Sequence, residues 1–424
     1  MANSFSKEER VAFEDILAGF NDALVLSRNV SVYRTDSTMM ERANNIIWRP
    51  MPYIARSYSG TDMSANFLDN TQLAVPSSLG FSRSSPWVMN ATDLRDSLQE
   101  GRLGDAAKQK LASDINTSIM DVAANQGTIV VKRTSAASGY DDVAAMDAAM
   151  NEIGVQADSR YLALSSRDYN AMASNLSQAS RSFGNQKSDR AYERSYVGPI
   201  AGFETYKLDY ANRLTAAAGG AGLTMSTLDA AVNYYVPKAT NVASTGETAN
   251  VDNRYQTITV SSTTSVKAGD AFTVANLNAV HLITKRDVGQ LKTFRVISVP
   301  SSTTLVISPP MITNQVADAA STQYQNCVIN TKASNSAIVF LNTVSASVNV
   351  FFHRDALEIL PGRYAVPTDA GAAVMRGTTD QGIELVMQKQ YDIKTMKTNF
   401  RIDTLYGVVN KQPEMSGIAL FSQT

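Results

Sequence analysis

The chain has 424 residues, 44% of them hydrophobic, and its 38 Lys and Arg residues nearly balance its 39 Asp and Glu residues, for a net charge of -1. A chain of this length usually divides into two or three domains, and the balanced charge excludes a dedicated nucleic-acid binder that grips phosphates with a basic surface. The longest apolar runs are too short for a membrane span, and the polar, acidic N-terminus shows no secretory signal. The single cysteine, Cys327, excludes an intrachain disulfide, so we expect a protein kept in a reducing cytosol.

A helix is predicted at the N-terminus, over residues 6–26. Ser6 and Glu9 form a capping-box pattern, and Phe13, Leu17 and Phe20 follow at helical spacing. The apolar face of this helix packs either on its own domain or, as an arm, on a neighbouring subunit. The sequence leaves both possibilities open, because the polar segment that follows the helix offers no apolar surface nearby.

Residues 51–90 are mostly polar, with scattered hydrophobic residues and a turn signal at Gly60. Alternation over residues 72–75 predicts a strand, so the segment has the pattern of a long two-stranded loop. Loops of this length are uncommon unless they have a function. We therefore expect a functional role for this loop, unless the assignment of its elements is wrong.

A long amphipathic helix is predicted over residues 105–126. Gly101 and Gly104 interrupt the pattern upstream, and Gly127 is placed to end the helix. At about 1.5 Å per residue the helix is roughly 33 Å long, which is typical of a strut across a small domain. Its apolar stripe recurs at spacings of three or four residues and comprises Ala107, Leu111, Ile115, Ile119 and Val122.

Strands and helices alternate after this helix. Residues 128–131 and 161–164 have strand patterns, Ser165-Ser166 begins a helix, and another strand is expected over residues 204–207. The small residues 216–222 then form a linker. We expect a domain boundary there.

Residues 224–332 consist of short segments rich in Thr, Val and Ile, separated by turn residues, which predicts a small β-sandwich or barrel. Within this region residues 238–253 form a polar loop. Strands resume after Lys332, at residues 337–341 and 348–352. The α+β part is therefore expected to be split in sequence around an inserted all-β domain.

Residues able to perform chemistry are scarce. His281 and His353 have no cysteine near them in sequence, so a structural or surface role is expected for both. Cys327 is expected to be a half-buried thiol, and the adjacent acids Asp141 and Asp142 are expected in a solvated turn, since neighbouring side chains point apart. We therefore predict no catalytic residue, no metal site and no cofactor.

Several stretches, in order along nearly the whole chain, carry a family resemblance. Residues 400–407, Phe-Arg-Ile-Asp-Thr-Leu-Tyr-Gly, with Pro413-Glu414 after them, resemble the closing strand of the major capsid (coat) proteins of tailed double-stranded DNA bacteriophages. Residues 44–50, Asn-Asn-Ile-Ile-Trp-Arg-Pro, are similar to the short-tailed phage branch that carries a β-barrel insertion domain. The other matching stretches are residues 161–169, 198–203, 349–357, and 251–255 running on to Gly269-Asp270.

The resemblance implies an α+β fold, the tailed-phage major capsid fold, with an N-terminal arm, an extended β-loop, a long spine helix, peripheral and axial domains, and an inserted all-β barrel domain. In that family the arm and the extended loop reach adjacent subunits. Carried over to this chain, the division is 1–35 N-terminal arm, 36–50 peripheral domain, first part, 51–77 extended β-loop, 78–127 peripheral domain with spine helix 105–126, 128–222 axial/peripheral α+β core, first part, 223–332 β-barrel insertion domain, and 333–424 axial/peripheral core, second part.

The resemblance also implies a non-enzymatic structural protein that self-assembles into an icosahedral procapsid and mature head enclosing the phage genome. The implied partners are copies of itself in hexamers and pentamers, a scaffolding protein, a portal protein and double-stranded DNA enclosed without sequence-specific binding, with no cofactor and no membrane. Assembly is expected in the host bacterial cytoplasm. The candidate inter-subunit contacts are Phe13, Leu17, Phe20, Trp48, Arg56, Tyr58, Lys238, Glu247, Asp252 and Arg254.

Two other functions stay open at this point. One is a non-catalytic carbohydrate- or cell-binding phage structural protein, which would show a cluster of exposed aromatic residues in the β domain. The other is a hydrolase with a β accessory domain, which would need convergent acids that the sequence does not reveal.

Overall fold

The computed structural model describes residues 5, 7–33, 46–52, 54–55, 57, 59–64, 66–67, 70–90, 97–179, 186–208, 210–218, 222–226, 228, 233–316, 318–366 and 371–424. The chain forms two compact units, each made from three separate segments. Unit 1 comprises Met1–Ile47, Pro76–Ile119 and Leu357–Val409, and unit 2 comprises Trp48–Val75, Met120–Ala356 and Asn410–Thr424.

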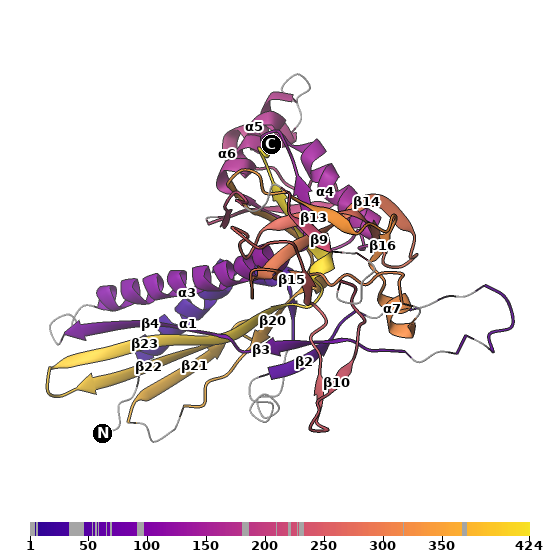
Figure 1. The fold of residues 1–424 in the computed structure, drawn as a ribbon. Coiled ribbons are helices and arrows are strands. Elements are labelled where there is room, and N and C mark those ends of the chain that lie inside the picture. Colours follow the sequence, from indigo (N-terminus) through magenta and orange to yellow (C-terminus); the bar gives the residue numbers. More distant parts are fainter. Residues whose placement is uncertain are drawn as a thin grey trace. The chain divides into compact units, whose positions relative to one another are not determined.

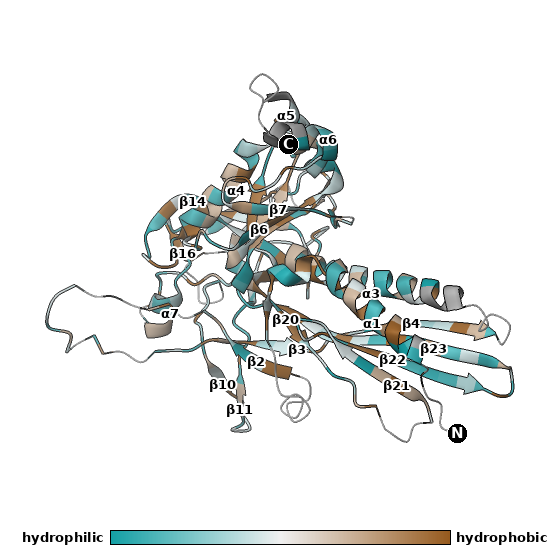
Figure 2. Cartoon of the chain, turned by 180° about the vertical axis from the view of Figure 1, so that it is seen from behind, coloured by the Kyte–Doolittle hydropathy of each residue, from teal (hydrophilic) through white to brown (hydrophobic). Residues whose placement is uncertain are grey.

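Unit 1 is built on a six-stranded sheet around one long strand, β23 (Lys397–Asn410), which has β22 on one side and β4 on the other (Figure 1). Alternate residues of β23 from Thr398 to Tyr406 are all buried, as expected for a strand with one covered face. Figure 2 shows the matching change along β22 from hydrophobic residues near its start to hydrophilic residues near its end. The other strands of this sheet are β1 (Ser31–Val32), β4 (Phe81–Asn90), β20 (Leu357–Pro361), β21 (Ala373–Thr378) and β22 (Glu384–Asp392).

Strand β4 is held to β23 by aromatic pairs. Trp87 stacks on Phe400 with ring centroids 5.5 Å apart, and Phe81 stacks on Tyr406 at 5.4 Å. Both pairs join residues directly opposite each other in the ladder, where such stacking adds about 0.5–1.5 kcal/mol beyond area burial. The sequence pattern alone did not predict β4.

Helix α1 (Lys7–Ala23) packs on the sheet of its own unit. Glu9 forms an ion pair with Lys389 of β22, and Asn21 Nδ2 donates a hydrogen bond to Asp380 Oδ2 at 2.8 Å. Gly377 of β21 makes room for the helix, because a Cβ there would lie 2.7 Å from Leu17 Cδ2. Of the two possibilities left open by the sequence, the structure has the helix on its own domain, and η1 (Leu26–Asn29) follows it.

The predicted strut is helix α3 (Ser97–Gln126), which is 30 residues and therefore about 45 Å long. Its stripe from Ala107 to Ile119 is buried, as predicted, but the helix begins eight residues earlier than residue 105. A glycine inside a helix costs only about 1 kcal/mol, so Gly101 and Gly104 do not stop it. Gly104 is needed for packing, since a Cβ there would lie 2.5 Å from Ile16 Cδ1.

The extended loop has a two-stranded base. Strands β2 (Ile46–Pro50) and β3 (Ala74–Ser78) pair with each other, and the Met51 N–H donates to Leu73 O at 2.9 Å just beyond them. The base therefore begins at Ile46, five residues before the predicted boundary. The two-stranded character of the loop is as expected from the sequence.

Unit 2 contains a five-stranded α/β layer with strand order β5-β24-β19-β6-β7. Helix α4 (Tyr140–Ile153) supplies Val143, Met146 and Met150 to its core and ends at Gly154 in the left-handed conformation. The remaining elements are β5 (Ile129–Lys132), β6 (Arg160–Ser165), α5 (Ser166–Ala179), α6 (Gln186–Arg194), β7 (Phe203–Leu208), β19 (Asn349–His353), η4 (Arg354–Ala356), η5 (Pro413–Met415) and β24 (Ser416–Leu420).

The inserted β domain of unit 2 is a closed barrel. Its strands follow the order β12-β15-β14-β13-β17-β9, and a bridge between Met225 and Val260 brings β9 back to the end of β12. Phe272 and Phe294 stack at 5.7 Å inside it. The elements of this domain are β9 (Thr224–Ser226), β10 (Thr240–Val242), β11 (Thr248–Asn250), β12 (Gln256–Thr259), β13 (Ala271–Val280), β14 (Asp287–Ser298), β15 (Thr304–Ser308), α7 (Ala319–Tyr324), β16 (Cys327–Ile329) and β17 (Asn335–Phe340), and β8 (Arg213–Leu214) pairs with β18 (Ala346–Ser347) beside it.

The predicted boundary of the insertion at Lys332 is too early. Strand β17 pairs with β13 through Phe340 and Phe272 and with β9 through Ala337 and Thr224, so it is a barrel strand and not part of the core. The alternating burial of β17 fits a barrel wall as well as a core sheet, which is why the sequence did not distinguish them.

Candidate functional site

Among the residues that the structure describes, no group of side chains has the arrangement of a catalytic site. No group of three or more His, Cys, Asp or Glu side chains within those residues is arranged to hold a metal ion. Neither is any helix in the described ranges long and apolar enough to cross a membrane. His353 is buried in β19, where burial is the largest cause lowering its pKa, and its Nδ1 accepts a hydrogen bond from the Asp355 N–H at 3.2 Å.

The acid pair predicted in a solvated turn has a different role. Asp142 is fully buried in the first turn of α4, accepts hydrogen bonds from Ser138 N at 2.7 Å and Ser138 Oγ at 3.0 Å, and pairs with Arg133 Nε at 2.7 Å. An acid is favoured at the positive end of a helix dipole. Asp142 therefore fixes the start of α4, and the prediction of a solvated turn is wrong for it.

The N-terminal helix offers little surface at the residues chosen from the sequence. Phe13 and Phe20 are 5% and 0% exposed, and Leu17 is half-buried. Phe13 and Phe20 are buried within their own unit, where Phe13 lies against Gly377 of β21 and the neighbouring Ile16 lies against Gly104 of α3. We therefore withdraw these two as inter-subunit contacts.

The extended loop keeps exposed apolar surface. Trp48 in β2 is half-buried, whereas Phe67, farther along the loop, is 87% exposed. Arg56 and Tyr58, two further candidate contacts, lie outside the described residues. An isolated exposed phenylalanine is ordinary on a protein surface, but one on a long loop is a reasonable anchor for a partner.

The polar loop predicted in the insertion is an exposed hairpin, β10–β11. Its strands form the narrow ribbon that carries the label β10 in Figure 1 and pair from Thr240 with Asn250 to Val242 with Thr248. All six strand residues are exposed. Lys238 and Glu247 are both exposed, and Val242 is 62% exposed. The hairpin thus presents one apolar side chain larger than alanine, Val242, and both signs of charge to the outside.

The base of this hairpin is fixed by internal polar contacts. Asn253 holds both sides of it, accepting from the Lys238 N–H at 3.1 Å and donating to Lys238 O at 2.9 Å. Arg254 Nη2 pairs with Asp252 at 2.6 Å, and Arg254 Nη1 donates to Asn410 O at 3.0 Å. With Arg254 buried, we withdraw it as an inter-subunit contact, and its charge pairs with Asp252 in the same chain.

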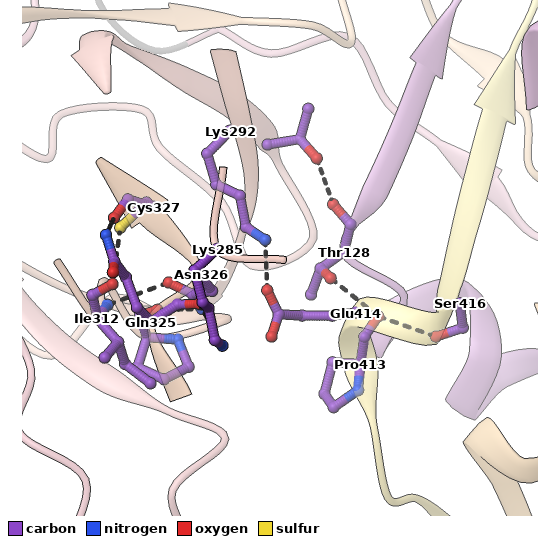
Figure 3. A network of polar contacts seen from close by, with 12 residues as sticks. Thr128, Lys285, Lys292, Ile312, Gln325, Asn326, Cys327, Pro413, Glu414 and Ser416 are labelled. Carbon is purple, nitrogen blue, oxygen red and sulfur yellow. Dashed lines mark hydrogen bonds and ion pairs between the residues drawn. The ribbon is translucent and has the colours of Figure 1, made fainter. Parts of the chain in front are cut away.

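A second polar network joins the barrel to the α/β layer inside unit 2 (Figure 3). Lys292 of β14 forms an ion pair with Glu414 of η5, and their side chains are only 4% and 11% exposed. Thr128 donates through Oγ1 to Pro413 O at 2.8 Å, beside the same pair. Removing one partner of such a buried pair typically costs 3–5 kcal/mol, so the pair ties the barrel strand to the core.

Two further side chains of this network have shifted pKa values. Burial lowers the pKa of Lys285 to about 8, and its Nζ donates to Gln325 O at 3.0 Å. Burial raises the pKa of Cys327 to about 12, which keeps it a neutral thiol. Cys327 is fully buried where the sequence suggested half-burial, and it is not a nucleophile at neutral pH.

Sequence reasoning missed the Lys292–Glu414 pair. The two residues are 122 positions apart, and neither stands in a charge pattern. The only signal was the Pro413-Glu414 dipeptide in the stretches that carried the family resemblance. By contrast, Asp252 and Arg254 are two positions apart in a turn, where Asp252 Oδ1 also accepts from the Arg254 N–H at 3.1 Å, and an Asp at the start of a turn is a local signal for such a contact.

Comparison with known proteins gives a family. The family model described as "P22 coat protein - gene protein 5" matches residues 1–422. Among solved structures, one of Mycobacterium phage Che8 matches with 10% identity, a TM-score of 0.45, and coverage of 93% of this chain and 90% of that chain. The asymmetric unit of the bacteriophage PhiM1 mature capsid matches with 10% identity, a TM-score of 0.42, and coverage of 100% and 89%. The CUS-3 coat protein I-domain matches with 36% identity and a TM-score of 0.21, covering 29% of this chain and 98% of that one.

The match to the family model extends over almost the whole chain, including the split α+β part, the long helix and the inserted barrel. It favours neither the carbohydrate-binding function nor the hydrolase. The chain therefore belongs to the P22 coat protein family, and it is a structural major capsid protein that builds the icosahedral head of a tailed phage.

Proposed function

We propose that this coat protein assembles, together with a scaffolding and a portal protein, into a procapsid in the host bacterial cytoplasm. The shell then encloses double-stranded DNA without sequence-specific binding and without catalysis by the coat subunit. The nearly neutral charge of the chain supports this, since a wall that gripped phosphates would need a strong positive surface.

The domain roles follow the same proposal. The segment 51–77 acts as the extended loop that reaches a neighbouring subunit, the sheet and α3 form the peripheral domain, and the α/β layer forms the axial domain. The observation that carries the proposal is the β10–β11 hairpin, a fixed ribbon exposed along its whole length. Because the hairpin is anchored at its base, it is already ordered before it binds, and binding costs it little further conformational entropy.

We propose that the hairpin contacts the same hairpin of a subunit in a neighbouring capsomer. In a two-fold contact, residue i of one chain meets residue j of the copy and j meets i, and we propose that Lys238 of one chain pairs in this way with Glu247 of the other. An exposed ion pair contributes only about 0.2–1 kcal/mol, but hundreds of copies repeat it in one shell.

Charge reversal tests this contact. We expect Lys238→Glu and Glu247→Lys each to lower the yield of closed shells severalfold, measured by sedimentation and electron microscopy of the expressed protein. The double reversal should restore the yield, because it regenerates opposite charges across the two-fold. Lys267→Glu, the same charge change at an exposed barrel residue outside the hairpin, is the matched control.

If both single variants formed shells in full yield, the hairpin–hairpin contact would be contradicted. Failure of the unaltered protein to form any shell with its scaffolding protein present would instead contradict the proposal of scaffold-directed assembly.

A further inference from the structure

The C-terminal end of α3 has no positive charge of its own. Its last turn, Ala123–Ala124–Asn125–Gln126, contains no basic residue, although the last carbonyl groups of a helix lack partners within the helix and carry the negative end of its dipole. The Gly127 N–H continues the helical pattern by donating to Ala123 O at 3.0 Å. The carbonyl of Gly127, the first residue after the helix, lies at this end and accepts a hydrogen bond from outside the helix.

The inserted barrel supplies that donor. Arg295 of β14, which is 1% exposed, donates from Nη1 to Gly127 O at 3.3 Å, across 168 positions of sequence. Its Nε donates to Gly269 O at 3.1 Å inside the barrel, so the same guanidinium is held at both ends. Burial lowers the pKa of Arg295 to about 10, and nearby Asp270 favours its charged form, so it stays a cation at neutral pH.

Thr293 strengthens the same contact. It lies two positions before Arg295 on β14 and so shares a side of the strand with it, while Phe294 between them is buried in the barrel core. Thr293 Oγ1 donates to Thr128 O at 2.6 Å. The Lys292–Glu414 pair of Figure 3 lies one position farther along the strand, so this stretch of β14 contacts the chain just beyond α3 and the η5 turn next to it.

The barrel also covers the end of a second helix. The Leu282 N–H, in the turn between β13 and β14, donates to Ile153 O at 2.9 Å, where α4 ends. The His281 ring lies against Gly154, since a Cβ on that glycine would come within 2.7 Å of His281 Cε1. The last turn of α4 likewise has no basic residue. One hairpin, β13–β14, therefore donates to the last carbonyl of α4, at Ile153, and to the carbonyls of Gly127 and Thr128, which directly follow α3.

We propose that the inserted barrel is a clamp on the C-terminal ends of α3 and α4, with Arg295 as its positioning residue, and that assembly of the coat subunit requires this clamp to be closed. The barrel is rigid because its sheet is closed, so it fixes the distance between the two helix ends. An open clamp removes these barrel partners from both ends, and the α/β layer beside them then loses the fixed geometry that repeated contacts in a shell demand.

The test uses the full chain with Arg295→Met, Arg295→Lys and Arg286→Met. Arg286→Met is the matched control, because Arg286 is an exposed arginine at the start of the same strand region. Hydrogen exchange is measured on the unassembled subunit for residues 120–128, 150–155 and the barrel strand 271–275. Arg295→Met should speed exchange at 120–128 on the order of tenfold, whereas exchange at 271–275 stays unchanged.

Assembly is measured in parallel, at a temperature where circular dichroism shows each variant folded. We expect Arg295→Met to lose most of its shell yield, Arg295→Lys to recover a substantial part because it keeps the cation, and Arg286→Met to match the unaltered protein. Should Arg295→Met fail to fold, Thr293→Val, which removes one hydroxyl donor and keeps the shape, carries the same test.

Unchanged exchange at 120–128 in a folded Arg295→Met subunit would overturn the clamp. Faster exchange there with full shell yield would overturn its role in assembly. Faster exchange confined to 271–275 would make Arg295 a barrel residue only, which also overturns the proposal.

Discussion

At the scale of single residues, the junction in Figure 3 combines one carboxylate with two ammonium groups. Glu414 pairs with Lys292, and it also favours the charged form of Lys285, yet burial still lowers the pKa of Lys285 to about 8 from the usual 10.5. A lysine whose pKa is lowered on folding opposes folding while it is charged in both states. This opposition is complete below pH 8 and is relieved as the pH rises from about 8 toward 10.5.

This linkage can be measured with Lys285→Met. Between pH 8 and 9 the folded chain loses the Lys285 proton while the unfolded chain keeps it, so the free energy of unfolding of the unaltered protein should rise relative to the variant. The expected rise is about 1 kcal/mol over this interval. Urea unfolding at pH 7.5, 8, 8.5 and 9 gives the comparison, and the subtraction removes the contributions of other titrating groups. If the free energies of unfolding of the two proteins changed with pH in parallel, the lowered pKa of Lys285 would be contradicted.

Individual site residues were predicted with mixed success, and the reason is the distance between partners. The spacing of Phe13, Leu17 and Phe20 indicates an apolar helical face, but not which surface covers it. The covering strands lie far along the chain, as the 380 positions between Glu9 and Lys389 show. The exposed charges Lys238 and Glu247 could be predicted because a polar loop with no large apolar residue has little reason to be buried.

At the scale of elements, strong local patterns predicted α3, the α/β alternation and most barrel strands. Strand β4 was missed because its sequence, Phe-Ser-Arg-Ser-Ser-Pro-Trp-Val-Met-Asn, lacks a regular apolar alternation and most of its residues stay exposed or half-exposed. Its stability comes from pairing along β23 and from the stacked rings, which are long-range contacts. The glycines in α3 led to a wrong prediction of its first residue, because packing outweighs helix propensity there.

The need for strand β17 in the barrel can be tested with two fragments of the chain. A fragment of residues 223–332 lacks β17, which leaves β13 without one of its ladder partners and β9 with only its contacts to the β12 side. We expect this fragment to show no cooperative unfolding. A fragment of residues 223–342 should unfold cooperatively in urea, with an m-value of about 1–3 kcal/mol/M.

Each fragment is the control for the other, since they differ only by the last ten residues. Asn342 is included because it is fully buried and its Oδ1 accepts from the Ala271 N–H at 3.1 Å. Cooperative unfolding of the shorter fragment would show that the barrel closes without β17.

At the scale of the whole molecule, the extended loop keeps much of its described surface exposed within one chain. Among its described residues, residues 59–62 and Phe67 are exposed, whereas its base at Met51 and Leu73 is hydrogen bonded. Fixing each backbone residue costs about 1–2 kcal/mol, so contacts with a neighbouring copy must offset that cost if the loop orders on assembly.

Hydrogen exchange on the subunit and on the shell tests this expectation. The part of the loop beyond its hydrogen-bonded base, residues 55–70, should exchange rapidly in the isolated subunit and at least tenfold more slowly in the shell, because assembly supplies the missing partners. The barrel strand 271–280, already closed in the single chain, should exchange equally in both states. Equal protection of residues 55–70 in the two states would speak against a loop that orders on assembly.

The alternation of the chain between its two units has a consequence for its synthesis. Six segments alternate between the units, so the chain passes from one to the other five times, and neither unit is complete until near the end of translation. Glu9 leaves the ribosome 380 residues ahead of Lys389, which is roughly 20–75 s at bacterial rates of about 5–20 residues per second. Throughout that interval the apolar face of the first helix has no strand of its sheet to pack against. The nascent chain therefore depends on chaperones or on temporary non-native contacts until about its last tenth has left the ribosome.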